Sequence, residues 1–507
     1  MLKIMKGSAD IYILAAGRIM LMITSIISIR IVTTLFSPSE VGRLNIIMSI
    51  YGWFNLSLVS GVWMYVIRKI NEWYDEGRAR RYIIYFGVYR LIIGIISILV
   101  LIPFQYLFGV GIAVKTGWLI LLVAGSIFVT GCNSDYISNI NLLGHRYWFV
   151  ILSLLTSWLG LGISVLFALK LSASSEYWLT GQLIGQIVIL LIAFVILIKY
   201  LKPSSNKKIF RNNKDFTLRN IFIFAWPLSI GVFLYWCNTQ GYRFIFEKVA
   251  GTGMLGLFAV GFGIGSSLMS FFDVLFNQYY YPIFYREIAN SNKQQRTIAW
   301  NKYASAFSPA IILMAIFVAT NGSLIAKVLT GEKFQQVGNI VLWGALAESL
   351  RMLVAITAMV SHAQLKMKPL IFPSITGAVI AIIGTFMFVR YNPIMGTGIA
   401  LSFGWLLALI HMYINMRKLL RIQIPWKRSY YSLVLSIPII IFFITTKKYF
   451  HVQTMLQSLI VLCISAIYLL FAQFILARKW LALAVKLPYI DNLEQKIKTI
   501  YEKIYGA

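Results

Sequence analysis

The chain has 507 residues, of which 59% are hydrophobic and only 12% are charged. A soluble protein carries about twice that share of charged residues, and apolar runs long enough to cross a bilayer, about 20 residues each, recur along the whole length. The composition therefore excludes an ordinary soluble protein, and the continuous apolar runs exclude the short alternating strands of a membrane β-barrel. We predict an all-α polytopic membrane protein.

We predict fourteen transmembrane spans. In chain order they cover residues 11–36, 44–67, 82–108, 117–140, 148–169, 177–198, 220–246, 254–282, 303–326, 336–361, 369–389, 396–416, 430–446 and 454–476. The first run lacks a small-residue cleavage site, so we expect a membrane helix there and not a cleaved signal peptide.

The distribution of basic residues predicts the orientation. With the N-terminus inside, 32 of the 46 Lys and Arg residues fall in inner segments and 9 in outer loops. Positive loops resist translocation, so both termini are expected on the cytoplasmic side. The same rule explains the net charge of +30 without nucleic-acid binding.

The polar segments divide the chain. We predict an N-terminal lobe of six spans (1–199), a basic cytoplasmic linker (200–219), a second lobe of six spans (220–419), two further spans (420–476) and a tail (477–507). In the tail, apolar residues from Ile490 to Ile504 recur at three- and four-residue steps, which predicts an amphipathic helix. It is expected to rest on the anionic inner leaflet or, alternatively, to dock on a soluble partner.

The two lobes begin alike. Arg30 lies 12 residues before Gly42, and Arg243 lies 13 residues before Gly256. Each Arg is about two turns before the end of its span and each Gly opens the next span. The segment Ser37-Pro-Ser-Glu40 is expected to begin the second span, with Ser37 as the N-cap and Glu40 completing a capping box. The match indicates two structural repeats, a common plan for transporters.

This layout resembles a known family. The opening helix, the LFSPSEVGRLNI segment (Leu35 to Ile46), fourteen spans and a basic mid-chain linker are similar to those of Wzx-type polysaccharide-unit flippases. These belong to the multidrug/oligosaccharidyl-lipid/polysaccharide exporter superfamily. The resemblance implies alternating access between two lobes. It also implies a substrate, an undecaprenyl-pyrophosphate-linked oligosaccharide for O-antigen, capsule or exopolysaccharide, that crosses the bacterial cytoplasmic (inner) membrane. Polysaccharide polymerase machinery is then an expected partner.

Charged residues inside spans are the candidate site. They are five cations, Arg18, Arg30, Arg90, Arg243 and Arg351, and three acids, Asp135, Asp273 and Glu348. Such groups cost at least about 2.5–3.5 kcal/mol at mid-bilayer, so they are expected to face the protein interior or a wet cavity. Because the planar Arg fork suits a diphosphate, the cations are candidate substrate ligands. The acids are candidates for coupling to H⁺ or Na⁺.

Each of these charged residues also has an interpretation in which it only stabilises the structure. Arg30 and Arg243 lie near span ends and could reach the headgroups, as could Arg18 at the opposite face. Arg90 could pair with Asp135 on a neighbouring span. Glu348 and Arg351 share a helix face and could pair, and Asp273 could pair with Arg243.

Three function classes remain to be weighed. A flippase and an ion-coupled multidrug antiporter of the same superfamily both fit, and the excess of Arg favours the flippase. A membrane enzyme is not expected, because no outer loop is large enough for an active site. The chain has no Walker motif. Its four histidines and three cysteines show no metal-ligand spacing, so no metal or cofactor is expected.

Overall fold

The computed structural model describes residues 2–109, 114–201, 218–289, 291–364, 366–449 and 454–484. Every regular element in these ranges is helical, which confirms the all-α prediction. Most of the predicted linker and the whole amphipathic tail helix lie outside the described residues.

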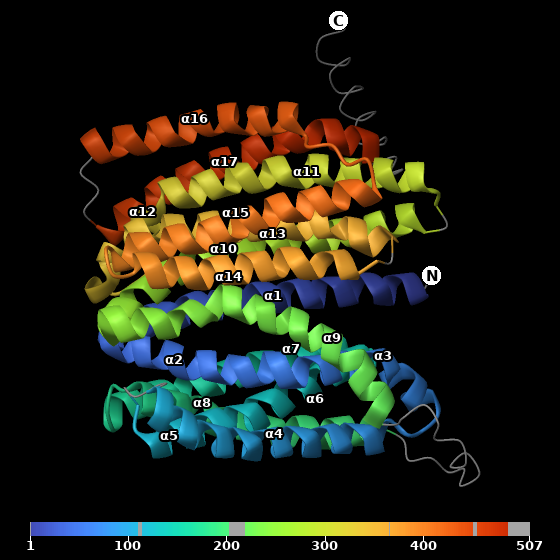
Figure 1. The fold of residues 1–507 in the computed structure, drawn as a ribbon, viewed down its shortest axis with the longest axis vertical. Helices are drawn as coiled ribbons and strands as arrows, with labels where there is room; N and C mark the ends of the chain where they lie inside the picture. Colours follow the sequence, from blue (N-terminus) through green and yellow to red (C-terminus); the bar gives the residue numbers. More distant parts are fainter. Residues whose placement is uncertain are drawn as a thin grey trace, which may run out of the picture. The chain divides into compact units, whose positions relative to one another are not determined.

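The helices follow one another along the chain (Figure 1). They are α1 (Leu2–Leu35), α2 (Pro38–Phe54), η1 (Asn55–Val59), α3 (Ser60–Asp75), α4 (Ala79–Phe108), α5 (Thr116–Gly125), η2 (Ser126–Thr130), α6 (Gly131–Leu142), α7 (Arg146–Lys170), α8 (Ser175–Tyr200), α9 (Leu218–Trp236), η4 (Cys237–Gly241), α10 (Tyr242–Ile288), α11 (Lys293–Thr320), α12 (Gly322–Leu329), η5 (Glu332–Val337), α13 (Gly338–Gln364), η6 (Lys368–Leu370), α14 (Ile371–Phe388), α15 (Pro393–Leu419), α16 (Trp426–Tyr449) and α17 (Met455–Ala484).

Thirteen helical stretches of the described chain are long and apolar enough to cross a membrane. The longest, Arg219–Ile288, is broken at Gly251, where φ is 80° and ψ is 166°. Glycine adopts this backbone conformation without a steric penalty, so the helix axis can change there. The stretch therefore holds both the seventh and the eighth predicted spans, and the chain is a multi-pass membrane protein.

The ninth span differs from its predicted range of 303–326. Helix α11 begins ten residues earlier, at Lys293, because Asn292 and Gln295 form a reciprocal capping box. It ends at Thr320, and a separate short helix, α12, follows. The apolar pattern located the membrane-crossing part of this helix but not its polar first turns.

The chain divides into two compact units. The first consists of Met1–Gly263, Leu329–Ile340 and Ile371–Ala408. In it α1 packs beside α7, α7 beside α8, and α3 beside α9 (Figure 1). This unit combines helices from both predicted lobes.

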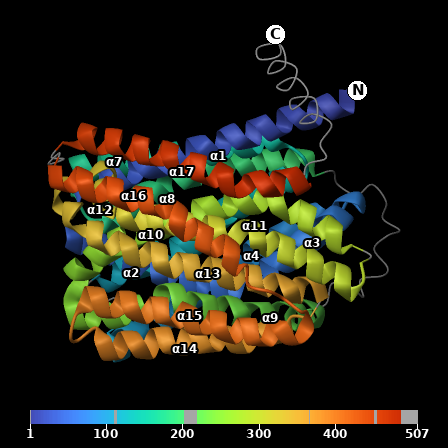
Figure 2. The ribbon, with the colours of Figure 1, turned by 90° about the horizontal axis from the view of Figure 1, so that it is seen from above.

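The second unit consists of Ile264–Val328, Val341–Leu370 and Leu409–Ala507. Its helix α11 packs against α16 and α17 (Figure 2). The Gln473 amide of α17 donates to the Ala310 carbonyl at 3.1 Å, and Arg428 of α16 donates to the Ser305 carbonyl at 3.2 Å.

The start of the second span is where the sequence predicts it. Pro38 is the first residue of α2, and the Ser37 side chain accepts from the Glu40 N–H at 3.4 Å. The second half of the predicted capping box is absent, because the Glu40 carboxylate is used elsewhere. It accepts from the backbone and hydroxyl of Ser175, at 2.8 and 3.0 Å, and pairs with Arg43 at 2.8 Å. The carboxylate thus lies at the N-terminus of α8, where the helix dipole favours negative charge.

The two glycines of the sequence repeat pack against each other. A Cβ atom on Gly42 would overlap the Thr252 carbonyl, and one on Gly256 would overlap the Pro38 carbonyl and lie 3.0 Å from the Gly42 nitrogen. Helices α2 and α10 therefore cross with their backbones in contact, as small residues allow in membrane proteins.

We predict that Gly42→Ala destabilises the protein, because its Cβ would meet a backbone carbonyl that cannot move aside. Overpacking of this kind costs about 1–3 kcal/mol. Thermal unfolding of the purified protein in detergent should show a lower midpoint. Gly231→Ala in α9 is the control, since no described atom lies within 4 Å of its added Cβ. Equal midpoints for the two variants would contradict the close crossing.

Candidate functional site

Arg90 is buried in a polar cluster inside the first unit, with a side-chain exposure of 4%. Its Nε donates to Asp135, and its Nη1 donates to the Asn55 side chain at 3.0 Å and to the Ile127 carbonyl at 3.2 Å. The pairing with Asp135 that the sequence allowed is present. A guanidinium held by three acceptors has little capacity left for an outside ligand.

The surroundings of Arg90 explain why these acceptors are available. Asn55 opens the π-helical turn η1, and Ile127 lies in a second π-helical turn, η2. Such turns interrupt the α-helical bonding ladder and redirect backbone and side-chain groups. Gly131, directly after η2, lies against the guanidinium, since a Cβ there would be 2.5 Å from the Arg90 Cζ.

Arg30 lies near the C-terminal end of α1 and contacts a loop from a distant part of the chain. Its Nη1 donates to the Thr330 carbonyl. The next residue, Gly331, donates its N–H to the Thr33 hydroxyl at 2.9 Å, and a Cβ on Gly331 would lie 2.6 Å from the Thr33 carbonyl. The charge therefore takes part in holding the end of α1 against this loop.

Arg243 lies in the first turn of α10 and is half-buried. Its Nη1 donates to the Ser49 hydroxyl at 2.9 Å and to the Asn45 carbonyl at 3.4 Å, both on α2. Its Nε is buried and has no hydrogen-bond partner among the described residues. Its hydrogen-bond partners among the described residues are neutral, so no acid in contact with it compensates the positive charge.

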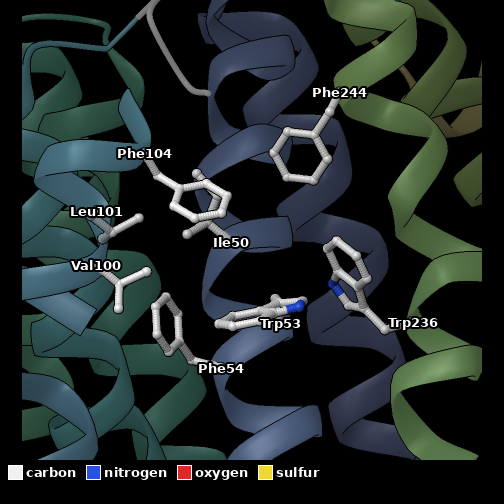
Figure 3. A pocket seen from close by; sticks show the side chains of 8 residues that line it. All are labelled: Ile50, Trp53, Phe54, Val100, Leu101, Phe104, Trp236 and Phe244. Carbon is white, nitrogen blue, oxygen red and sulfur yellow. The ribbon is translucent and has the colours of Figure 1, made fainter. Parts of the chain in front are cut away.

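An apolar pocket of about 180 Å³ is lined by Phe244, the residue that follows Arg243, and by Trp236, whose indole contacts Ser49. Figure 3 shows Val100, Leu101, Phe104 and Phe54 on one side, Trp236 and Phe244 on the other, and Trp53 and Ile50 between them. The Trp236 indole donates to the Ser49 carbonyl at 3.0 Å, so its one polar group is satisfied. Ser49 thus contacts both the cation and a wall of the pocket.

Arg18 lies in the first half of the α1 span and is exposed. It makes no ion pair or hydrogen bond with the side chains that the structure describes. Arg18 and Arg243 are therefore two predicted cations that form no ion pair with an acid among the described residues.

Arg351 lies between two acids in the second unit. It contacts Asp273 of α10 at 2.8 Å and Glu348, one turn away on α13, at 2.8 Å. The pairing of Glu348 with Arg351 that the sequence allowed is present, and Asp273 pairs with Arg351 and not with Arg243. Two carboxylates around one guanidinium leave a net negative charge.

Neutral groups complete this acidic cluster. The Asn277 amide donates to Asp273 at 2.6 Å, and the Ser270 hydroxyl donates to Glu348 at 2.5 Å. Both carboxylates are mostly buried, with exposures of 14% and 11%. The five-to-three excess of Arg in the sequence therefore does not extend to this cluster.

A second pocket, of about 290 Å³, was not anticipated from the sequence. It lies between α1, α7 and α8, and we name it the hydroxyl–amide pocket. Its polar lining residues are Thr24, Ser25, Ser28, Thr156, Ser157, Gln182 and Gln186. On α1 and α8 they recur at three- and four-residue steps, and on α7 Thr156 and Ser157 are adjacent. This spacing is visible in the sequence, but the residues carry no charge and were not among the predicted site residues.

Glu247 is another residue that the sequence analysis did not single out. It lies one turn after Arg243 and is half-buried, and its Oε1 has no hydrogen-bond partner among the described residues. The two residues form no ion pair with one another. Their spacing of four residues was the available signal.

No group of three or more metal-binding side chains occurs in the part of the chain that the structure describes. The three cysteines are free, with Cys132 and Cys237 buried.

We predict that Arg90→Met lowers stability by about 3–5 kcal/mol, because it leaves Asp135 as an uncompensated buried charge. The double variant Arg90→Met/Asp135→Leu should recover most of the loss, since neither charge remains. Thermal unfolding of the wild type and the three variants, including Asp135→Leu alone, gives the interaction energy. Additive effects of the two single substitutions would show that the pair does not act as a unit.

Neither the protein-family models nor the curated proteins include a match to this chain. Solved structures do match it. A lipid II flippase, MurJ, in an inward closed conformation superposes with a TM-score of 0.67 at 16% identity, over 92% of this chain and 99% of that chain.

Multidrug transporters also match. An inward-facing MATE family transporter of the MOP superfamily has a TM-score of 0.60 at 15% identity, over 78% of this chain and 94% of its own. An outward-facing one has a TM-score of 0.53 at 15% identity, over 81% and 93%. At these identities the likeness concerns the fold, and the fold of this chain is the one that the lipid II flippase and these MOP-superfamily transporters share.

Proposed function

We propose that this protein is a flippase that carries an undecaprenyl-pyrophosphate-linked oligosaccharide repeat unit across the bacterial cytoplasmic membrane by alternating access. The product would feed the synthesis of a surface polysaccharide such as O-antigen, capsule or exopolysaccharide. Both termini would be cytoplasmic, and polysaccharide polymerase machinery would take over the translocated unit.

The observation that carries the proposal is that Arg243 and the apolar pocket share a contact residue, Ser49. Among the described residues Arg243 has only neutral hydrogen-bond partners, and its Nε has none. Phe244, the next residue, lines the pocket together with aromatic residues of α2 and α9. A carrier with a diphosphate on an isoprenoid chain needs a cation next to an apolar surface. An Arg fork can donate paired hydrogen bonds to phosphate oxygens.

The extent of the structural likeness supports a flippase over a multidrug transporter. The part of this chain left uncovered by the lipid II flippase is smaller than α16 and α17 together, so the match includes at least part of these last helices. The MATE structures cover 78% and 81% of the chain. Likeness of fold supports the proposal without establishing a substrate.

Arg18 and Arg30 are proposed as further ligands of the diphosphate at other stages of transport. Arg18 is exposed, and Arg30 holds a loop carbonyl that a phosphate oxygen could replace. Arg90 is not included, because Asp135 and two other acceptors occupy it.

An ion-coupled multidrug antiporter is the second candidate. The acidic cluster of Asp273, Glu348 and Arg351, with its net negative charge, favours it, as does the unpartnered carboxylate oxygen of Glu247. Within the flippase proposal, Asp273 and Glu348 are instead the candidates for H⁺ or Na⁺ coupling.

Deleting the gene should separate the two candidates. For a flippase we expect lipid-linked repeat units to accumulate on the inner leaflet and surface polysaccharide to fall, with drug tolerance unchanged. Extraction and mass spectrometry of lipid-linked glycans, together with surface staining, measure this. Unchanged glycan and lower drug tolerance would favour the antiporter and contradict our proposal.

We predict that Arg243→Ala reduces binding of undecaprenyl diphosphate roughly tenfold or more, because hydrogen bonds to a charged group contribute about 1.5–3 kcal/mol. Arg243→Lys should recover only part, since Lys cannot form the bidentate contact. Arg390→Ala, at an exposed residue beside the Phe386 ring, is the control. Titration of the lipid into purified protein in nanodiscs measures the affinity, and wild-type affinity in Arg243→Ala would rule out this site.

A further inference from the structure

The hydroxyl–amide pocket lies at the middle of three membrane spans. Its residues fall near the centres of Ile13–Leu35, Arg146–Lys170 and Ser175–Tyr200. Polar groups at this depth have no lipid partners, so they either bond within the protein or face a water-filled or ligand-filled cavity. Transport proteins commonly bind their substrates near the bilayer midplane.

Close packing of α7 and α8 forms one wall of the hydroxyl–amide pocket. A Cβ on Gly181 would lie 2.6 Å from the Ser164 Cα, and one on Gly185 would lie 2.7 Å from the Gly160 nitrogen. The glycines bring the two backbones together, and Gln182, which follows Gly181, lines the pocket. The glutamine side chains are therefore presented by a rigid helix pair.

Some of the lining groups are already satisfied within the protein. Thr24 donates to the Met20 carbonyl and accepts from the Trp158 indole at 3.0 Å. Thr156 accepts from Asn133 at 3.1 Å, and the Gln186 carbonyl oxygen accepts from Thr130 at 2.6 Å. These hydrogen bonds fix the positions of the Thr24, Thr156 and Gln186 side chains in the pocket wall.

Other lining groups are unused. The side chains of Ser25, Ser28 and Gln182 make no hydrogen bond with any residue that the structure describes, and the Gln186 amide nitrogen likewise donates to none of them. Together they offer hydroxyls, which donate and accept, and an amide, which does both through separate atoms. No charged residue lines the pocket.

This chemistry selects among ligands. A diphosphate or a cationic drug would need an opposite charge, which the pocket lacks. A neutral sugar presents many hydroxyls, each both a donor and an acceptor, and matches such a lining. The Trp158 indole donates to Thr24, a lining residue, and its ring is 58% exposed. Such a ring has an apolar face of the kind that packs against the C–H face of a sugar.

We propose that the hydroxyl–amide pocket binds a neutral sugar residue of the transported glycan, separately from the cationic contacts to its diphosphate. This inference rests on the proposed function and adds a site for the sugar part of the substrate. It assigns Gln182 and Ser28 as sugar-binding residues.

The test compares two lipids that share the carrier but differ in the sugar. One is the lipid-linked repeat unit extracted from the deletion strain, and the other is undecaprenyl diphosphate without sugar. Both are titrated into the full-length protein in nanodiscs. We expect the wild type to bind the glycosylated lipid more tightly. Gln182→Leu should lower that affinity about tenfold while the affinity for the sugar-free lipid is unchanged.

Two further variants keep the test decisive. Ser28→Ala removes one hydroxyl with little change in volume and should show a smaller loss in the same direction. Thr180→Val is the control, because its hydroxyl bonds to the Glu176 carbonyl of its own helix and does not line the pocket. Thermal unfolding checks that each variant is folded.

The outcomes distinguish failure of the proposed sugar site from failure of the proposed flippase function. Equal wild-type affinity for both lipids, or equal losses for both in Gln182→Leu, would overturn the sugar site and leave the flippase standing. Binding of neither lipid would overturn the flippase and the sugar site with it. Affinity that depends on Na⁺ for both lipids and loses that dependence in Gln182→Leu would assign the pocket to a cation and overturn the inference.

Discussion

A polar side chain inside a hydrocarbon layer must be satisfied by the protein or by water held within it, because lipid tails offer no hydrogen bonds. The charged residues of this chain follow that constraint in two places. Arg90 pairs with Asp135 and takes two further acceptors from π-helical turns. Arg351 lies between Asp273 and Glu348. In both, the charges mainly stabilise one helix arrangement.

Polar groups that the described protein leaves without a hydrogen-bond partner are the candidates for binding a substrate. Among the described residues, the buried Nε of Arg243 has no hydrogen-bond partner. The side chains of Ser25, Ser28 and Gln182 line the hydroxyl–amide pocket and form no hydrogen bond with a described residue. Under our proposal, Arg243 would bind the diphosphate of a lipid-linked glycan and the hydroxyl–amide pocket one of its neutral sugars.

Glycines determine how closely the surrounding helices approach. Gly42 and Gly256 bring the backbones of α2 and α10 into contact, and Gly181 and Gly185 do the same for α7 and α8. Any side chain at these positions would overlap a neighbouring backbone, so the helices would separate. The walls of the pockets therefore depend on residues that make no chemical contact with a ligand.

The sequence by itself determined the all-α class, the number of spans and the cap at Ser37, because apolar length and capping are local properties. It also identified the Gly42 and Gly256 repeat. Only the tertiary structure decided that Asp273 pairs with Arg351, that Glu40 caps α8, and that hydroxyls and amides from three helices share a pocket. The Asp273–Arg351 pair and the Glu40–Ser175 contact join residues 78 and 135 positions apart. Helix periodicity defines the face of one helix but not the face that packs against it.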